Sequence, residues 1–307
     1  MSLRAELVRL GLRWLMKPTN HPGVTIEQRR RRIADFERRV PAPPSDTEMV
    51  QTRCGGIDAL RVAMPRSGPS GDPARHILFL HGGGYISGSP ALYLGLLWRI
   101  AAAAGARITA IDYRLAPEHP FPAALDDAAA AWRGLISQGA DPQRVAIIGD
   151  SAGGGLALAL ALRLRDEAAA LPAAIVAMSP WTDLALTGPS LRENADSDPM
   201  MNADDVPHLA ACYLAGGDPR DPYASPLYGD PHGLPPTLIQ VGSDEILRDD
   251  AVRMAKRMQA AGCIIDLEVW PRMPHVWQAF ATMLPEARRA ILRIGSFVKE
   301  HTGAAPA

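Results

Sequence analysis

An alternation of short apolar runs with helix-like stretches is the feature that most constrains how this chain can fold. The apolar runs are His76–Leu80, Arg107–Asp112, Val145–Ile148, Ala174–Met178, Thr237–Val241 and Ile264–Trp270. The intervening stretches with helical character are Leu94–Ala104, Ala123–Ser137, Ala152–Ala169, Ala251–Ala261 and Pro285–His301. Continuously apolar strands separated by helices are typical of a mostly parallel sheet covered on both faces. Ligands of such sheets bind at the carboxyl ends of the strands, so we expect the chemistry there.

The first part of the chain has a different pattern. Residues 1–16 and 25–40 are predicted to be helices, because apolar residues recur in them at helical spacing. The segments Glu48–Arg53 and Asp58–Met64 are predicted to form a hairpin around two glycines. Further on, the polar, Pro- and Gly-containing segment 182–220 is weakly periodic and is predicted to be an insertion over one edge of the sheet.

Composition excludes several classes of protein. The 307 residues contain 32 Lys or Arg and 33 Asp or Glu, a balance that argues against a protein whose main role is to wrap nucleic acid or to bind membranes through a polybasic surface. The three cysteines are scattered and suit neither a disulfide framework nor a metal site. Charged residues interrupt the N-terminal apolar residues, and the longest uncharged apolar stretch is too short to span a bilayer. We therefore expect a cytoplasmic protein without a membrane span.

The strand Val145–Ile148 leads into Gly149-Asp150-Ser151-Ala152-Gly153 and then into a long apolar helix. This is a G-x-S-x-G sequence in the strand–turn–helix context of a nucleophile elbow, where a sharp turn exposes the serine hydroxyl. A glycine-rich turn with an incidental serine would give the same letters. The motif alone is therefore weak evidence for a catalytic serine. Further evidence comes from the sequences that follow other predicted strands.

A second glycine-rich loop follows the strand His76–Leu80 and reads His81-Gly82-Gly83-Gly84-Tyr85. Three successive glycines can direct backbone N–H groups into a cavity, as in the oxyanion hole of lipases and esterases. A phosphate-binding loop is disfavoured because no Lys-Ser or Lys-Thr pair follows. The loop therefore supports Ser151 as a nucleophile.

The general base is predicted from chain order. Hydrolases of this kind place the residues in the order serine, acid, histidine. Of the eight histidines, His275 lies in a loop just past the last predicted strand. The alternative interpretation is a buried histidine that forms hydrogen bonds in the core and has no catalytic role. We predict that His275 is the base.

The acid is expected after the strand Thr237–Val241, whose end reads Gly242-Ser243-Asp244-Glu245. We predict Asp244, which would hold the imidazole tautomer and stabilise the imidazolium. Glu245, Asp249 and Asp250 remain alternatives, although helix-dipole and ion-pair roles would explain the last two.

Taken together, these motifs resemble the hormone-sensitive-lipase-like branch of the α/β-hydrolase esterases, in its bacterial GDSAG form. The matching pieces span nearly the whole catalytic portion and are His81–Tyr85, Tyr113–Ala123, Gly149–Gly154, Asp244–Asp249 and His275. Glu245-Ile246 departs from the Pro-Leu that many members have after the acid. A weaker similarity, through Trp270 to Arg288, is to bacterial monoterpene ε-lactone hydrolases.

The resemblance implies an α/β-hydrolase fold with an eight-stranded sheet whose second strand is antiparallel. It implies N-terminal cap helices in 1–45, a first catalytic part in 46–181, a cap insertion in 182–220 and a second catalytic part in 221–307. The oxyanion donors would be the amides of Gly83, Gly84 and Ala152, with Gly82 supporting the turn. The resemblance also implies a homodimer.

The predicted function is a carboxylesterase that hydrolyses short- to medium-chain acyl esters through an acyl-enzyme, with no metal or organic cofactor. A lactone, amide or carbamate hydrolase with the same triad is the alternative, and a non-catalytic small-molecule binder is a remote one. The arginines of residues 1–16 could also flank an apolar face at a membrane surface, although a cap helix explains the same pattern.

Overall fold

The protein is built around one eight-stranded sheet, seen in a computed structural model that describes residues 2–65 and 75–303. The strand order is β1-β2-β4-β3-β5-β6-β7-β8, and β2 runs antiparallel to both of its neighbours while the remaining ladders are parallel. The strands are β1 (Glu48–Cys54), β2 (Ile57–Ala63), β3 (Arg75–Leu80), β4 (Ala106–Ile111), β5 (Val145–Asp150), β6 (Ala174–Met178), β7 (Thr237–Gly242) and β8 (Ile265–Trp270). This topology confirms the α/β-hydrolase fold, including the antiparallel second strand.

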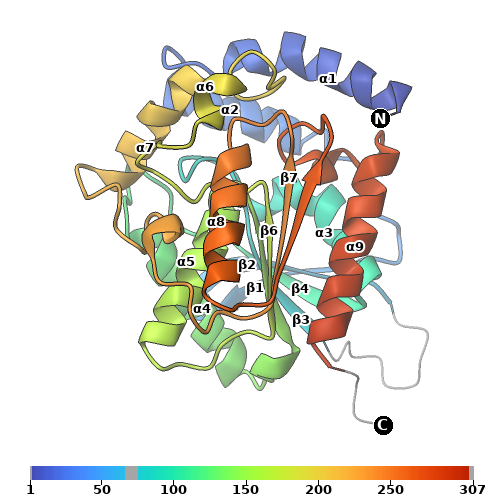
Figure 1. Cartoon of the computed structure of the whole chain (residues 1–307). Helices are drawn as coiled ribbons and strands as arrows, with labels where there is room; N and C mark the ends of the chain where they lie inside the picture. Colours follow the sequence, from blue (N-terminus) through green and yellow to red (C-terminus); the bar gives the residue numbers. More distant parts are fainter. Residues whose placement is uncertain (1, 66–74, 304–307) are drawn as a thin grey trace.

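Helices cover both faces of the sheet, as Figure 1 shows. On one face lie α3 (Leu94–Ala104) and α9 (Pro285–His301), and on the other lie α4 (Ala123–Ser137), α5 (Ala152–Asp166) and α8 (Arg248–Ala260). Each layer of helices buries its own hydrophobic core against the sheet. The apolar runs of the sequence are therefore continuous because both faces of the strands are covered.

The central strand β5 illustrates this arrangement. Successive side chains of a strand point to opposite faces, and here Val145 and Ile147 join the core under α4, α5 and α8. Ala146 and Ile148 join the core under α3 and α9. All six residues of β5 are buried, so the strand holds the residues that follow it in a fixed position.

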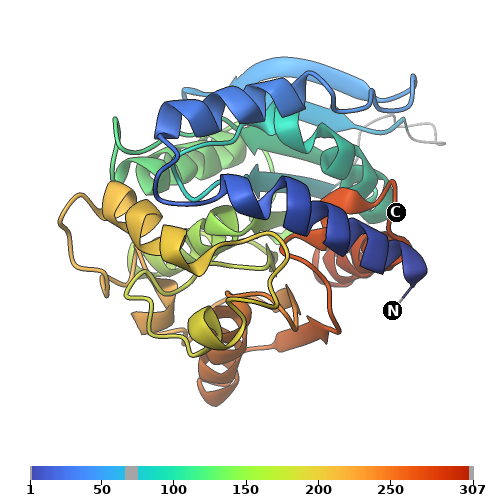
Figure 2. The ribbon, with the colours of Figure 1, turned by 90° about the horizontal axis from the view of Figure 1, so that it is seen from above.

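Four further helices lie beyond the end of the sheet where the parallel strands finish (Figures 1 and 2). They are α1 (Leu3–Leu15), α2 (Ile26–Glu37), α6 (Ser190–Glu193) and α7 (Val206–Leu214). The first two were predicted, and the last two lie in the predicted insertion. The N-terminal segment contacts the insertion, since Lys17 Nζ, just after α1, donates to the carbonyl of Asp198, between α6 and α7, at 2.7 Å.

Within the part of the chain that the structure describes, no helix has the length and apolar character needed to cross a membrane. The three cysteines carry free thiols. The described residues also contain no group of His, Cys, Asp or Glu arranged to hold a metal ion.

Candidate active site

Ser151 occupies the turn between β5 and α5, at the carboxyl end of the strand. Its backbone has φ 53° and ψ −122°, a conformation that L-residues rarely adopt and that stores strain at functional sites. The glycines on either side allow this turn, because a Cβ on Gly149 would lie 2.1 Å from the carbonyl oxygen of Gly153. The sequence therefore forms the sharp strand-to-helix turn that the G-x-S-x-G motif predicts.

His275 lies beside Ser151, although the two residues are far apart in the chain. Ser151 Oγ is 2.9 Å from His275 Nε2, and the opposite ring nitrogen, Nδ1, is 2.8 Å from Glu245 Oε2. Ser151 is 8% exposed and His275 3%, while Glu245 is fully buried. A neutral imidazole with Nδ1–H donating to the carboxylate presents an acceptor to the serine hydroxyl. Such an arrangement can take a proton from Ser151.

Both carboxylate oxygens of Glu245 have partners. Besides the His275 ring at Oε2, Oε1 accepts from the Gly242 amide at 2.5 Å and from the Ser179 hydroxyl at 2.8 Å. Ser179 Oγ in turn accepts from the Val276 amide at 3.1 Å, next to His275. A buried carboxylate needs such partners, and here they also hold the loop that carries the histidine.

The prediction of Asp244 as the partner of His275 is wrong in this geometry. Asp244 Oδ2 instead forms an ion pair with Arg9 Nη2 of α1 at 2.8 Å, and Oδ1 accepts a hydrogen bond from Ser243 Oγ at 2.8 Å. The turn after β7 directs consecutive side chains to different sides, so Glu245 points to the histidine and Asp244 points to α1. Glu245, which the sequence left as an alternative, is the carboxylate in contact.

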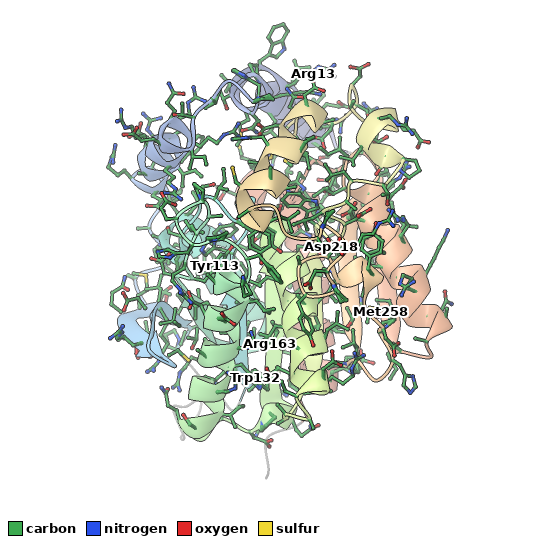
Figure 3. All side chains as sticks on the ribbon, turned by 90° about the vertical axis from the view of Figure 1, so that its left-hand side faces the viewer. Arg13, Tyr113, Trp132, Arg163, Asp218 and Met258 are labelled. Carbon is green, nitrogen blue, oxygen red and sulfur yellow. The ribbon has the colours of Figure 1, made fainter. Side chains whose placement is uncertain are left out.

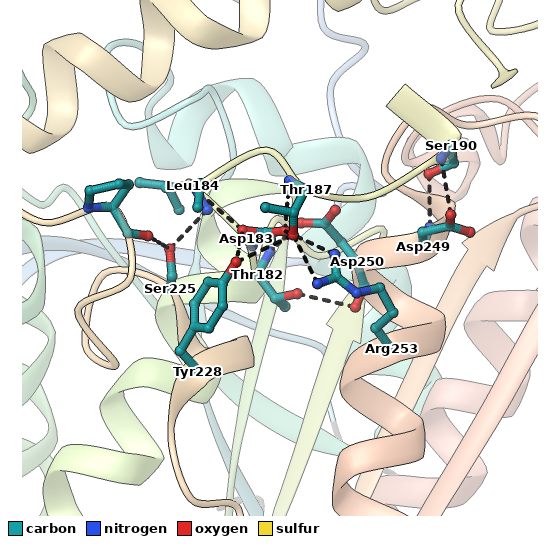
Figure 4. Close-up of polar contacts among 12 residues, drawn as sticks. Thr182, Asp183, Leu184, Thr187, Ser190, Ser225, Tyr228, Asp249, Asp250 and Arg253 are labelled. Atoms are coloured by element: carbon teal, nitrogen blue, oxygen red, sulfur yellow. Dashed lines mark hydrogen bonds and ion pairs between the residues drawn. The ribbon is translucent and has the colours of Figure 1, made fainter. Parts of the chain in front are cut away.

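The other two alternatives, Asp249 and Asp250, bind the start of the insertion, as Figure 4 shows. Asp249 Oδ2 accepts from the Ser190 amide at 2.9 Å, and Asp250 Oδ2 accepts from the amides of Thr182 and Asp183 at 2.8 and 2.9 Å. Burial raises the pKa of Asp250 to about 8. Both carboxylates attach the insertion to the body of the fold, and neither contacts His275.

Two of the predicted oxyanion residues, Gly83 and Gly84, lie in the loop after β3, and the third, Ala152, begins α5. Gly83 has φ +118° and Gly84 φ +63°, backbone conformations that glycine adopts without strain. Within the described residues, neither of these two amides nor that of Ala152 at the start of α5 has a protein acceptor. Free amides of this kind can donate to a developing negative charge on a bound carbonyl oxygen.

Gly82 has a different position, because its amide is already occupied. It donates to Asp150 Oδ1 at 3.0 Å and to the Tyr93 hydroxyl at 3.1 Å. Tyr93 in turn donates to Asp150 Oδ2 at 2.8 Å. Burial raises the pKa of Asp150 to about 7, against the opposing effects of the Tyr93 hydrogen bond, the His275 charge and the Gly82 amide. Asp150 therefore connects the serine turn to the glycine loop.

His81 is a packed residue of this loop. Its ring stacks on Tyr113 with centroids 4.2 Å apart, and Nδ1 is 2.8 Å from the Gly82 carbonyl. Complete burial lowers the pKa of His81 to about 4, so its ring is neutral and Nδ1 donates. It supports the loop and is not in contact with Ser151.

The electrostatics of His275 depend on its carboxylate neighbour. Burial by itself disfavours the charged ring, but the hydrogen bond and charge of Glu245 outweigh it. The charges of Asp198 and Asp150 add to this effect, and the pKa of His275 is raised above its usual 6.5. Burial also raises the pKa of Glu245, and the contact with His275 opposes that rise.

The insertion lies directly against the glycine loop. A Cβ on Gly84 would be 3.1 Å from Leu209 Cδ1 in α7, and Tyr85 stacks on Tyr213 of the same helix with centroids 3.7 Å apart. A separate cavity of about 260 Å³, lined by Leu227, Tyr228, Arg253, Lys256 and Arg257, contains none of the residues around Ser151. Helix α7 therefore packs against the loop that carries the predicted oxyanion glycines.

Sequence reasoning did not identify Ser179, Tyr93 or Asp198 as parts of the site. Asp198, in the insertion, accepts from the Ile246 amide at 3.0 Å and so holds the turn that carries Glu245. No local motif marks any of the three, because their partners come from distant segments. Asp150 could have been noticed, since it stands inside the serine motif and is buried there.

Ser151 lies on a strained strand-to-helix turn and is hydrogen-bonded to an imidazole, which is in turn hydrogen-bonded to a buried carboxylate. This arrangement defines the class of serine hydrolases. Residues 77–279 match the family description "alpha/beta hydrolase fold". The chain belongs to this family and is a serine ester hydrolase of the bacterial hormone-sensitive-lipase type.

Three comparisons support this assignment. The chain is 48% identical over 235 residues to an acetyl-hydrolase of Streptomyces hygroscopicus, which covers 76% of this chain and 79% of the relative. It is 36% identical to the putative acetyl-hydrolase LipR of Mycobacterium tuberculosis, over 98% of this chain and 96% of the relative. A crystal structure of an esterase from the bacterial hormone-sensitive lipase family superposes with a TM-score of 0.92, at 44% identity and 99% coverage of both chains.

Proposed function

We propose that Ser151, His275 and Glu245 form a catalytic triad that hydrolyses short- to medium-chain acyl esters. The observation that carries the proposal is the unbroken pair of contacts from Ser151 Oγ to His275, 2.9 Å, and from His275 to Glu245, 2.8 Å. Glu245 replaces Asp244 in this proposal because Asp244 is paired with Arg9.

In the proposed reaction, His275 Nε2 takes the hydroxyl proton as Ser151 Oγ bonds to the ester carbonyl carbon. Glu245 stabilises the imidazolium that forms and keeps the Nδ1 proton on the ring. The imidazolium then gives its proton to the leaving alcohol, and an acyl group remains on Ser151. A water molecule, deprotonated by His275 in the same way, releases the acid and restores the serine.

The amides of Gly83, Gly84 and Ala152 are the proposed donors to the oxyanion. None of these amides has a protein acceptor among residues 2–65 and 75–303, which supports this role, and removal of one such donor typically costs about 3–4 kcal/mol of transition-state stabilisation. Gly82, Asp150 and Tyr93 are positioning residues in this proposal, because they hold the loop and do not face the reacting carbonyl.

The proposed preference for short acyl groups has two supports. The relatives at 48% and 36% identity are named acetyl-hydrolases. In this chain, Leu209 of α7 lies against Gly84, and Ser151 is only 8% exposed. We infer that residues 1–45 and 182–220 act as a cap that limits the acyl pocket. The sequence predictions of a cytoplasmic location and a homodimer stay predictions.

The direct test uses p-nitrophenyl esters from acetate to palmitate. Ser151→Ala should remove turnover of all of them while the protein keeps its circular dichroism spectrum and melting temperature. Leu209→Ala should raise the kcat/KM ratio of octanoate to acetate, because it removes a side chain beside the oxyanion loop. Leu191→Ala, an equally buried leucine of the insertion, is the matched control. Undiminished turnover by Ser151→Ala would disprove the mechanism, and an unchanged ratio in Leu209→Ala would disprove the acyl-pocket assignment.

A further inference from the structure

Helix α1 has two unlike faces. Its inner face contributes the buried residues Ala5, Arg9 and Leu12. Its outer face carries four large apolar side chains that are 57–79% exposed, Leu3, Leu7, Leu10 and Trp14, called here the α1 stripe. At 3.6 residues per turn these four side chains fall within an arc of about 60°. An unbroken exposed row of this kind is unusual, because single exposed apolar residues are normally scattered.

Arginine side chains flank the α1 stripe on both sides. Arg4 and Arg13 are exposed and project about 100° to one side and about 80° to the other side of Leu3, by helical geometry. Figure 3 shows Arg13 at the outer end of the molecule, beyond the body of the fold. Unlike Arg9, which is paired with Asp244, neither forms an ion pair within the described residues. The outer face of α1 is therefore apolar in the middle and cationic at its edges.

Charge is also unevenly distributed along the chain, with a positive excess in the N-terminal segment that contains α1. Residues 1–40 contain ten Lys or Arg and four Asp or Glu, a net charge of +6. The rest of the chain contains 22 Lys or Arg and 29 Asp or Glu, a net charge of −7, so the near-neutral total conceals two opposite parts. Three of the arginines in residues 1–40, Arg9, Arg29 and Arg30, are paired with carboxylates of the rest of the chain, so a smaller positive excess remains on the segment that carries the α1 stripe.

We propose that α1 docks this protein on an anionic lipid surface. In this arrangement the α1 stripe enters the boundary between headgroups and acyl chains, and Arg4 and Arg13 contact lipid phosphates. A helix with a polar, basic flank and Leu and Trp on the other face binds membranes in this way, lying in the plane of the interface. The inference goes beyond ester hydrolysis and does not depend on it.

Charge favours lipid over a second copy of the chain as the occupant. A symmetric contact through the α1 stripe would bring the exposed cations Arg4 and Arg13 of two copies close together. An anionic membrane instead attracts the same segment. Docking through α1 would also turn the carboxyl ends of the strands, where Ser151 lies, toward the lipid, because α1 lies over that end of the sheet (Figure 2).

The test is co-sedimentation of full-length protein with vesicles. It uses Ser151→Ala protein so that lipid hydrolysis cannot alter the vesicles, and it compares phosphatidylcholine alone with phosphatidylcholine mixed with phosphatidylglycerol. We expect binding to the mixed vesicles that weakens as salt is raised, and much weaker binding to phosphatidylcholine alone. Because the readout is binding, its result is independent of the proposed triad.

Two pairs of substitutions separate the apolar contribution to lipid binding from the cationic one. Leu7→Gln with Leu10→Gln should lower affinity about tenfold or more, since two exposed leucines lose their apolar contact with lipid. Leu292→Gln in α9, a leucine that is 62% exposed, is the matched control and should bind as the parent does. Arg4→Gln with Arg13→Gln should lower affinity for the mixed vesicles about fivefold per arginine. The circular dichroism spectrum and melting temperature of each variant check that it folds.

Three results would overturn the proposal. The first is an absence of binding to the mixed vesicles, and the second is binding that the Leu7 and Leu10 substitutions leave unchanged. The third is a doubled molecular mass by light scattering that those same substitutions abolish, which would assign the α1 stripe to a second copy of the chain.

Discussion

Arg9 and Asp244 form an ion pair at 2.8 Å, and this contact attaches the N-terminal helix to the turn that carries Glu245. The same guanidinium donates to the carbonyl of Arg272 at 2.9 Å, in the loop that leads to His275. One buried side chain of α1 therefore holds both loops that place the carboxylate and the imidazole. The carboxylate that the sequence favoured as the catalytic acid instead binds α1.

The two neighbouring carboxylates should respond differently to substitution. Glu245→Gln removes the negative charge that stabilises the His275 imidazolium, and we expect kcat to fall about 10³- to 10⁴-fold. Asp244→Asn keeps the size of the side chain and leaves the Glu245 contact in place, so kcat should change less than about threefold. Both values are measured with p-nitrophenyl acetate. A larger loss in Asp244→Asn than in Glu245→Gln would restore Asp244 as the acid.

The pH profile of kcat/KM should report the raised pKa of His275. The ring must be neutral to accept the Ser151 proton, so activity is lost as pH falls through this pKa. Because the pKa is raised, the midpoint of the acid limb should lie above pH 6.5. Burial lowers the pKa of His275, and the charge of Glu245 raises it. Glu245→Gln removes that charge and should therefore move the midpoint to lower pH. The profile is recorded across roughly pH 5 to 9, and a midpoint that stays fixed in Glu245→Gln contradicts the assignment.

Arg9→Ala should destabilise the fold. It removes the partner of Asp244 and the donor to Arg272, both near the interface of α1, and breaking such a pair typically costs about 3–5 kcal/mol when it is buried. Since Asp244 is partly exposed, we expect about 2–3 kcal/mol in the free energy of urea unfolding. Arg13→Ala, an exposed arginine of the same helix, is the control and should change it by less than about 0.5 kcal/mol. Equal effects of the two substitutions would show that the Arg9 contact is not important.

Asp150 should act on the reaction through the glycine loop. Asp150→Asn retains an acceptor for the Gly82 amide, whereas Asp150→Ala removes the partner of Gly82 and Tyr93. We therefore expect Asp150→Ala to lower kcat about tenfold or more with little change in KM, and Asp150→Asn to recover most of it. The ratio of the two kcat values is the measurement. Equal losses in both variants would show that the charge of Asp150, and not its hydrogen bonds, is what the site requires.

Much of the framework could be predicted from local patterns. The apolar runs predicted the six consecutive strands from β3 to β8, and helix periodicity predicted α1 and α2, because these signals depend only on neighbouring residues. Element ends were less accurate: α8 begins at Arg248, not at Ala251, and α5 ends at Asp166, before Ala169. Helix ends depend on capping and on the packing of the following loop.

Ser151 and His275 could be named because the motif and the chain order mark them. The acid could not, since Asp244 and Glu245 are adjacent carboxylates and nothing local determines which one points inward. That choice depends on the backbone of the turn after β7, on the Gly242 amide and Ser179 hydroxyl that hold Glu245, and on Arg9 from the opposite end of the chain, which draws Asp244 away.

The sequence by itself determined the strand and helix pattern, the serine turn and the glycine loop, because each is a local property of a few consecutive residues. Only the tertiary structure decided which carboxylate holds His275, that Asp150 binds the glycine loop, and that the apolar row on α1 faces outward. These depend on packing between segments that lie far apart in the chain, and the free energy of such contacts exists only once the sheet has brought those segments together.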